Sequence, residues 1–76
     1  MVTKQIKLHK PDDVKEFVDV AGKCDFDIDI YYNRIIVDAK SFLGILSLDL
    51  SKTLSVSYDG VNDEFEVILD KFIAKE

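Results

Sequence analysis

Cysteine and histidine are almost absent from this 76-residue chain, which contains one of each, Cys24 and His9. A single cysteine excludes an intramolecular disulfide and is typical of a reducing compartment, so we expect a cytoplasmic protein. One cysteine and one histidine also leave no ligand set for structural zinc and no paired Cys–His nucleophile. We therefore expect neither a metal nor a cofactor.

Glycine and proline are scarce too, with one proline and three glycines in the chain. No glycine-rich phosphate-binding loop and no G-x-S-x-G nucleophile elbow is found. Asp25, Asp27 and Asp29 are spaced like the start of an EF-hand loop, but the positions that require Gly and Glu hold Ile30 and Ile36. A chain of this length forms one domain, residues 1–76, without room for a large enclosed active site, so we expect no enzyme.

Long hydrophobic runs and positive charge are missing as well. No apolar stretch reaches the ~20 residues of a membrane-spanning helix, and the first residues lack the apolar core of a signal peptide. Fifteen Asp and Glu residues against ten Lys and Arg residues give a net charge of −5. Because a negative field repels phosphate backbones and anionic lipids, we expect proteins as partners, and neither nucleic acid nor a membrane.

The first part of the chain alternates like a strand over residues 3–8 and then changes to a helical period. Pro11 is expected to begin the helix, because its missing N–H costs nothing in the first turn. Gly22 is expected to end it in the left-handed conformation. The apolar stripe of this helix consists of Val14, Phe17, Val18 and Ala21.

The middle of the chain predicts a hairpin followed by a short helix. Residues 25–32 alternate with acids on one face, which predicts a strand. Asn33-Arg34 can form a tight turn, and residues 35–39 return as the next strand. Ser41 is expected to cap a helix over residues 42–48.

The last part predicts one more strand and one more helix. Residues 54–58 alternate as a strand, and Asp59-Gly60 provides turn chemistry. Asn62 is expected to cap a helix with the apolar stripe Phe65, Ile68, Leu69 and Phe72, and with Lys71 and Lys75 at its end.

The resulting order, β-α-β-β-α-β-α, predicts an α+β fold of the open-faced β-sandwich type. We expect a four-stranded antiparallel sheet with three helices on one face and water on the other. The fourth strand can be inserted between the first and second. The residues expected on the water-facing side include Ile36, Asp38, Ser55 and Ser57.

One segment is more specific than this general pattern. From Lys40 to Leu48 the chain reads Lys-Ser-φ-φ-Gly-φ-φ-Ser-Leu, where φ is apolar. This segment closely resembles the second-helix motif of HPr, the histidine-containing phosphocarrier of the sugar phosphotransferase system. The resemblance extends from Phe17 to Phe72, and the element order is also that of the family. It implies an HPr-like fold and a bacterial, cytoplasmic protein.

The segment before the first helix departs from the family. HPr carriers have a Gly-φ-His-Ala-Arg-Pro motif there, whose histidine accepts the phosphoryl group, whereas this chain reads Leu8-His9-Lys10-Pro11-Asp12-Asp13. An ungapped alignment puts Lys10 at the phosphoacceptor position and Asp12 at that of the arginine. With one deletion, His9 becomes the phosphoacceptor and Lys10 takes the place of the arginine. The sequence alone does not choose between them.

Charge in this segment argues against a working carrier. A phosphohistidine needs donors and positive charge around its oxygens, and Asp12 and Asp13 lie where these would be. Lysine also does not replace the bidentate contact of arginine with phosphate. The first helix, which is a basic landing surface in the family, here carries more acidic than basic residues, which would weaken complexes with acidic enzymes.

The serine of the motif is retained. In low-GC Gram-positive relatives a dedicated kinase phosphorylates the serine that matches Ser41, and a branch without the histidine acts as corepressor of a transcription regulator. The resemblance therefore implies phosphorylation at Ser41, with Lys40 as a nearby cation. A plain helix cap also explains this serine, and the two interpretations are compatible.

The second helix has more apolar side chains than the sheet can cover. Ile45 and Leu48 can face the sheet, whereas Phe42, Leu43 and Leu46 cannot all do so. The alternative is that all of them complete the core. In the family the matching positions form a docking patch, so the resemblance implies partner binding through Lys40, Phe42, Leu43, Leu46 and Ser47.

Three hypotheses follow for the function. The leading one is an HPr-like regulatory or interaction protein, bound through the second helix by a serine kinase, a transcription regulator or phosphotransferase components. The rival is a functioning phosphocarrier that uses His9. The third is a protein whose only partner is itself, because small sheets with open edges can dimerise. We expect a monomer or a weak dimer.

Overall fold

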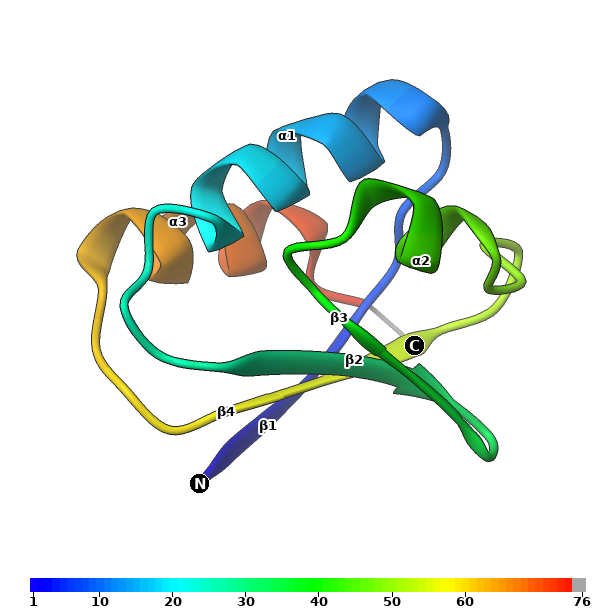
Figure 1. Cartoon of the computed structure of the whole chain (residues 1–76). Helices are drawn as coiled ribbons and strands as arrows, with labels where there is room; N and C mark the ends of the chain where they lie inside the picture. The colour runs from blue at the N-terminus through cyan, green and yellow to red at the C-terminus, as the bar shows by residue number, and fades with distance from the viewer. Residues whose placement is uncertain (75–76) are drawn as a thin grey trace.

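The computed structural model describes residues 1–74 and shows one sheet with three helices on one of its faces (Figure 1). The predicted open-faced α+β fold and its element order are confirmed. In chain order the elements are β1 (Val2–Ile6), α1 (Pro11–Ala21), β2 (Ile28–Tyr32), β3 (Ile35–Asp38), α2 (Phe42–Leu46), β4 (Leu54–Tyr58) and α3 (Asp63–Phe72).

The strands lie in the order β1-β4-β2-β3, and each neighbouring pair is antiparallel. The predicted insertion of the fourth strand between the first two is confirmed, because Val56 of β4 lies opposite Lys4 of β1 and Ile30 of β2. Asn33 adopts a positive φ of 55° in the turn between β2 and β3, as its sequence position predicts.

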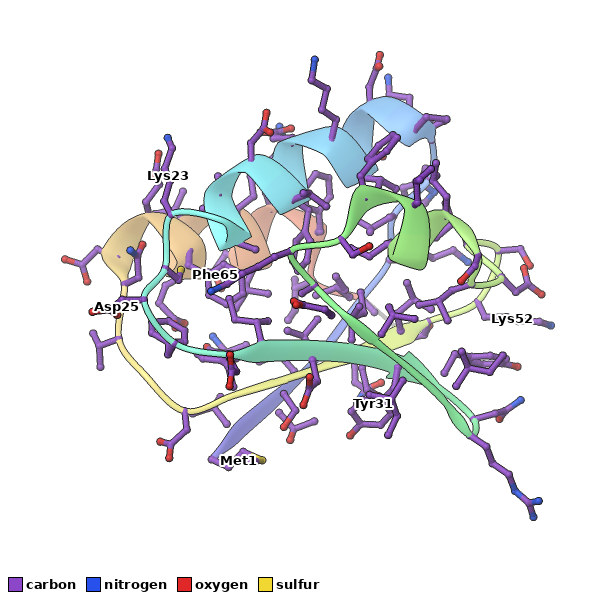
Figure 2. The ribbon with its side chains drawn as sticks, viewed as in Figure 1. Met1, Lys23, Asp25, Tyr31, Lys52 and Phe65 are labelled. Carbon is purple, nitrogen blue, oxygen red and sulfur yellow. The ribbon has the colours of Figure 1, made fainter. Side chains whose placement is uncertain are left out.

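The core lies between the inner face of the sheet and the helices. The predicted stripe of α3 is buried, and the rings of Phe17 and Phe65, 5.8 Å apart, join α1 to α3. The outer face is open to water: Ile36 and Asp38 are exposed there, while Ser55 and Ser57 are half-buried. Figure 2 shows Tyr31, which lies opposite Ile36, on the side away from the helices.

The predicted left-handed conformation of Gly22 is wrong. Its φ of −65° and ψ of −19° are right-handed, and its N–H donates to the Val18 carbonyl at 2.8 Å. The N–H groups of Lys23 and Cys24 donate to carbonyls three residues earlier, so the chain continues in a tighter right-handed turn. Such a turn satisfies the last carbonyls of α1 without a left-handed residue.

Strand boundaries also differ from the prediction. β1 ends at Ile6, two residues early, because the N–H of Lys7 donates to the Phe72 carbonyl at 2.8 Å. β2 begins only at Ile28, so Asp25 and Asp27 lie in the loop before it. Phe26, expected on the strand, packs from that loop against Tyr58 and Phe65, with ring centroids 6.0 and 6.4 Å away. α2 ends at Leu46 and not at residue 48.

The end of the described chain runs along β1. Ile73 forms a bridge with Ile6, and the N–H of Ala74 donates to the Gln5 carbonyl at 2.9 Å. This segment covers the last two residues of β1 on its outer edge, a contact that the sequence did not predict. Lys71 lies in the last turn of α3 as predicted, whereas Lys75 lies outside the described residues.

Candidate functional site

Ser41 caps the N-terminus of α2, as predicted. Its backbone is extended, and its Oγ accepts a hydrogen bond from the N–H of Gly44 at 3.0 Å. Asp38 fixes the turn before it: its carboxylate accepts from the Lys40 N–H and its carbonyl accepts from the Ser41 N–H, both at 2.9 Å. The Ser41 side chain is exposed to solvent while it caps the helix.

Gly44 allows α2 to pack closely on β3. A Cβ at this position would lie 3.0 Å from the Oγ of Ser41 and 3.4 Å from the Cβ of Val37. Both contacts are tight, and the first falls on the atom that caps the helix. A glycine inside so short a helix is therefore explained by packing, the one reason that the sequence offered.

Phe42, Leu43 and Leu46 form an exposed apolar surface, which we name the α2 patch. Leu43 is 77% exposed and the other two are 36% exposed, whereas Ile45 is fully buried. The exposure predicted for these residues is confirmed, and the alternative that they complete the core is wrong. Phe42 also lines a shallow hollow of about 390 Å³ with Lys15, Val18 and Asp19 of α1, so the patch continues onto α1.

The two polar residues assigned to this surface have different surroundings. Lys40 directs its ammonium group to the Cys24 carbonyl at 3.0 Å, which joins the start of α2 to the end of α1. The structure thus directs Lys40 away from the role of a cation for a phosphate on Ser41. Ser47 is exposed at the end of α2, and its hydroxyl donates to the Gly44 carbonyl at 2.6 Å.

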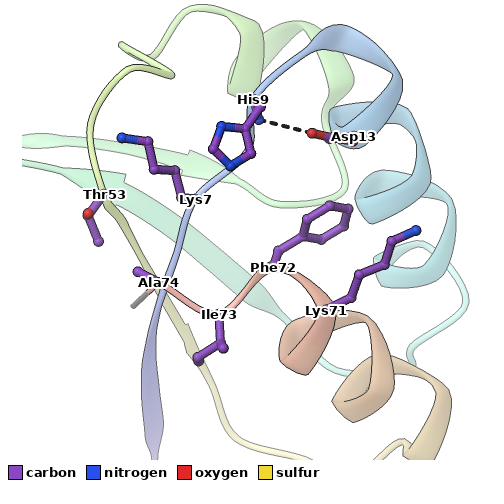
Figure 3. Close-up of a pocket in the computed structure, with 8 residues that line it drawn as sticks. All are labelled: Lys7, His9, Asp13, Thr53, Lys71, Phe72, Ile73 and Ala74. Carbon is purple, nitrogen blue, oxygen red and sulfur yellow. Dashed lines mark hydrogen bonds between the residues drawn. The ribbon is translucent and has the colours of Figure 1, made fainter. Parts of the chain in front are cut away.

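His9 lies at the junction between β1 and α1, beside a hollow of about 550 Å³ (Figure 3). Its side chain is exposed, and in Figure 3 the imidazole lies beside Lys7. The main-chain N–H of His9 donates to the carboxylate of Asp13 at 3.0 Å. Lys10 is the N-cap residue and Pro11 begins α1 as predicted.

Charged side chains around this hollow already form contacts with other residues of the chain. Lys7 donates to the Ser51 carbonyl at 2.9 Å. Lys71 donates to both carboxylate oxygens of Glu16, at 2.7 and 2.8 Å. Asp13 meanwhile places a carboxylate at the positive end of the α1 dipole, where an incoming phosphoryl group would otherwise be favoured.

Comparison with solved structures decides the family. The chain resembles the crystal structure of HPr-C-His from Thermoanaerobacter tengcongensis with a TM-score of 0.71 and 32% identity, over 95% of this chain and 88% of that chain. The chain belongs to the HPr family. The fold is also that of the phosphocarrier protein HPr from Bacillus anthracis str. Ames, with a TM-score of 0.65 and 24% identity over 92% and 89% of the two chains. No family model matches the sequence, and no curated protein does.

Neither a metal-binding cluster nor a membrane-spanning helix is found among the described residues of this HPr-family chain. Within residues 1–74, no three His, Cys, Asp or Glu side chains come together in a way that could hold a metal ion. None of the helices in that range is long and apolar enough to cross a membrane.

The long-range contacts around His9 and around α2 could not be predicted from the sequence. Lys7 and residues 71–74 line the hollow beside His9, and Lys40 reaches Cys24. These contacts join segments far apart in the chain, and no local pattern marks them. The α2 patch was found because an excess of apolar residues in a short helix is a local signal.

Proposed function

We propose that this HPr-family protein is a regulatory and interaction protein of the phosphotransferase system, without catalytic activity of its own. Partner proteins bind it through the α2 patch, and a serine kinase phosphorylates Ser41. One observation carries the proposal: an exposed apolar surface lies directly beside an exposed serine hydroxyl on the same helix.

The α2 patch has the properties of a docking surface. Its three residues are large, contiguous along one short helix and accessible, and the charged α1 residues Lys15 and Asp19 border it. Apolar centres with polar rims are typical of protein interfaces. On a protein with a net charge of −5, a partner is expected to present an apolar group within basic surroundings.

Phosphorylation at Ser41 would change this surface without unfolding it. A phosphoserine adds a charge of about −1.5 to −2 at neutral pH. Ser41 already accepts a hydrogen bond from a helix N–H, so phosphate oxygens can replace its hydroxyl as acceptor. The new charge would lie next to Phe42, at the border of the α2 patch. A partner protein that binds the α2 patch would therefore recognise the modification as a change in surface charge.

The rival function, a carrier that uses His9, is less well supported. Asp13, whose carboxylate accepts from the His9 N–H, would repel a phosphoryl group, and both Lys7 and Lys71 form contacts within the chain. A carrier needs free donors around the transferred group.

Intact-mass spectrometry tests both functions. With ATP and the serine kinase of a low-GC Gram-positive organism, the protein should gain one acid-stable phosphoryl group of roughly 80 Da. Ser41→Ala should abolish the gain, whereas Ser51→Ala, at an exposed serine outside the predicted partner-binding residues, should retain it.

The carrier is tested with phosphoenolpyruvate and the first enzyme of the phosphotransferase system. We expect no acid-labile gain in mass under these conditions. Stoichiometric acid-labile labelling that disappears in His9→Ala would establish the carrier function instead. Kinase labelling that persists in Ser41→Ala would remove Ser41 from the proposal.

A further inference from the structure

The two edges of the sheet differ in how they end. At β1 one end of the edge is covered, because Ile73 forms a bridge with Ile6 and the N–H of Ala74 donates to the Gln5 carbonyl. At the other edge, β3 is the last strand, and no further strand of residues 1–74 pairs with it. An uncovered edge presents a row of backbone groups to which another strand can bind.

The backbone of Ile36 faces this open edge. The N–H of Ala39 donates to the Ile28 carbonyl at 2.9 Å, so this position bonds to the β2 side of the hairpin. Bonding positions alternate along an antiparallel pair, so Ile35 and Val37 also direct their backbone groups to β2. Ile36 between them directs its N–H and its carbonyl outward.

The side chains of β3 do not protect the edge. Natural edge strands usually carry lysine, proline or inward-pointing charges that discourage pairing. β3 reads Ile-Ile-Val-Asp, and its first two residues, on opposite faces, are 52% and 67% exposed. Such a run of β-branched residues favours addition of a strand.

Charges of opposite sign lie at the two ends of β3. Arg34 is the only arginine of the chain, and it forms no ion pair with any of residues 1–74. At the other end Asp38 lies directly across from Asp29, and neither of them has an ion-pair partner in that range. Like charges that face each other across two strands are unfavourable, so a cation beside Asp38 would be stabilising.

We propose that β3 pairs antiparallel with β3 of a second copy of this chain, with Ile36 opposite Ile36 of the second copy. This register lets the two Ile36 residues exchange both of their outward backbone hydrogen bonds. It also places Arg34 of each copy opposite Asp38 of the other, and Ile35 opposite Val37. The contact is a two-fold, self-complementary interface that extends one sheet across both copies.

The dimer is weak and depends on concentration. β3 has only four residues, so the contact falls below the size of stable interfaces. It does not depend on the proposed function, because none of its residues belongs to the α2 patch. Kinase labelling and self-association can therefore each fail without the other.

Charge reversal tests both the surface and the register. Arg34→Asp and Asp38→Arg should each weaken self-association roughly tenfold or more, because like charges then face each other across the two-fold axis. An equal mixture of these two variants should associate again, because every Asp then faces an Arg of the other copy. Sedimentation equilibrium over a wide range of concentrations measures each state.

A second pair of variants avoids the hydrogen bond between Asp38 and Lys40. Ile36→Lys should make the protein monomeric, whereas Val67→Lys, which replaces a similarly exposed aliphatic residue on α3, should associate like the parent chain. In the parent chain, hydrogen exchange of the Ile36 N–H should slow as the concentration rises. Circular dichroism checks that each variant is folded.

Several results would overturn the proposal. A parent chain that stays monomeric at all concentrations rules out self-pairing, as does a dimer that survives Ile36→Lys. A mixture of the charge variants that fails to associate rules out the register. Protection of Ile36 that appears only when a different protein is added would assign the edge to a strand of that protein.

Discussion

Three small residues, Ser41, Gly44 and Gly60, stand where separate segments approach each other. Ser41 and Gly44 share one hydrogen bond at the start of α2. At Gly60 a Cβ would lie 2.3 Å from the Phe26 ring, so glycine is needed there for space. Its φ is not positive, so the turn after Asp59 does not require a left-handed glycine here. Substitutions at these positions should act on packing or capping.

The first prediction concerns the cap. Ser41→Ala should lower the free energy of unfolding by about 1 kcal/mol, because the N–H of Gly44 loses its acceptor. Ser41→Asp should leave it within about 0.5 kcal/mol of the parent, because aspartate caps helices as well as serine does. Urea denaturation measures both, with Ser47→Ala as a comparison that removes the bond from Ser47 to the Gly44 carbonyl but leaves the N-cap bond at Ser41 intact. If the Ser41→Asp variant fails to fold, this result would contradict the proposal that phosphorylation at Ser41 changes only the surface of the protein.

At the scale of elements, α2 is divided between core and surface. Leu43→Ala should change the free energy of unfolding by less than about 0.5 kcal/mol, because its side chain is 77% exposed. Ile45→Ala, the matched core substitution, should cost about 2–5 kcal/mol. In the kinase assay, Leu43→Ala should slow labelling of Ser41, although the fold is intact. Unchanged labelling would remove Leu43 from the docking surface.

Elements could be predicted where the signal lies within a few residues. The stripe of α3, the alternation of β4 and the caps at Ser41 and Asn62 are local patterns, and each is confirmed. The predicted start of β2 was wrong because Phe26 continues the apolar alternation of the strand in sequence, although in the structure it packs against the core from a loop.

The candidate site was predictable to the same extent. The exposure of the α2 patch follows from counting apolar residues in a short helix, but the partner of Lys40 does not. The carbonyl that it binds belongs to a residue that the fold alone brings near. The resemblance to HPr indicated which residues form the candidate site, whereas the contacts of their charged groups could be seen only in the fold.

At the scale of the whole molecule, one side-chain network joins the sheet to α3. Glu66 of α3 accepts hydrogen bonds from Lys4 of β1 at 2.8 Å and from the Tyr58 hydroxyl of β4 at 2.6 Å. The hydrogen bond from Lys4, and to a smaller extent the one from Tyr58, lowers the pKa of Glu66. Burial is the main cause that raises the pKa of Tyr58, and the hydrogen bond to Glu66 raises it further. The hydrogen bond to Glu66 also raises the pKa of Lys4.

These shifts set the pH range in which the network stabilises the fold. Glu66 contributes above its unfolded pKa of about 4.5, and the contribution is lost as the pH falls through the lower folded pKa. Tyr58 and Lys4 contribute below their unfolded pKa values of about 10.0 and 10.5, and their contributions are lost as the pH rises through the raised folded values. The free energy of unfolding should therefore fall at both ends of the pH scale.

The last prediction separates the two ends. Tyr58→Phe should cost about 1 kcal/mol near neutral pH and remove the part of the alkaline decline that belongs to the phenol. Tyr31→Phe, on the opposite face of the sheet, should retain that decline. Glu66→Gln should reduce the acid decline at a cost of about 1 kcal/mol or less, because the Lys4–Glu66 pair is partly exposed. Urea denaturation across the pH range measures all three variants. If Tyr58→Phe and the parent chain decline equally above pH ~10, the phenol does not contribute to stability in the way its contact with Glu66 implies.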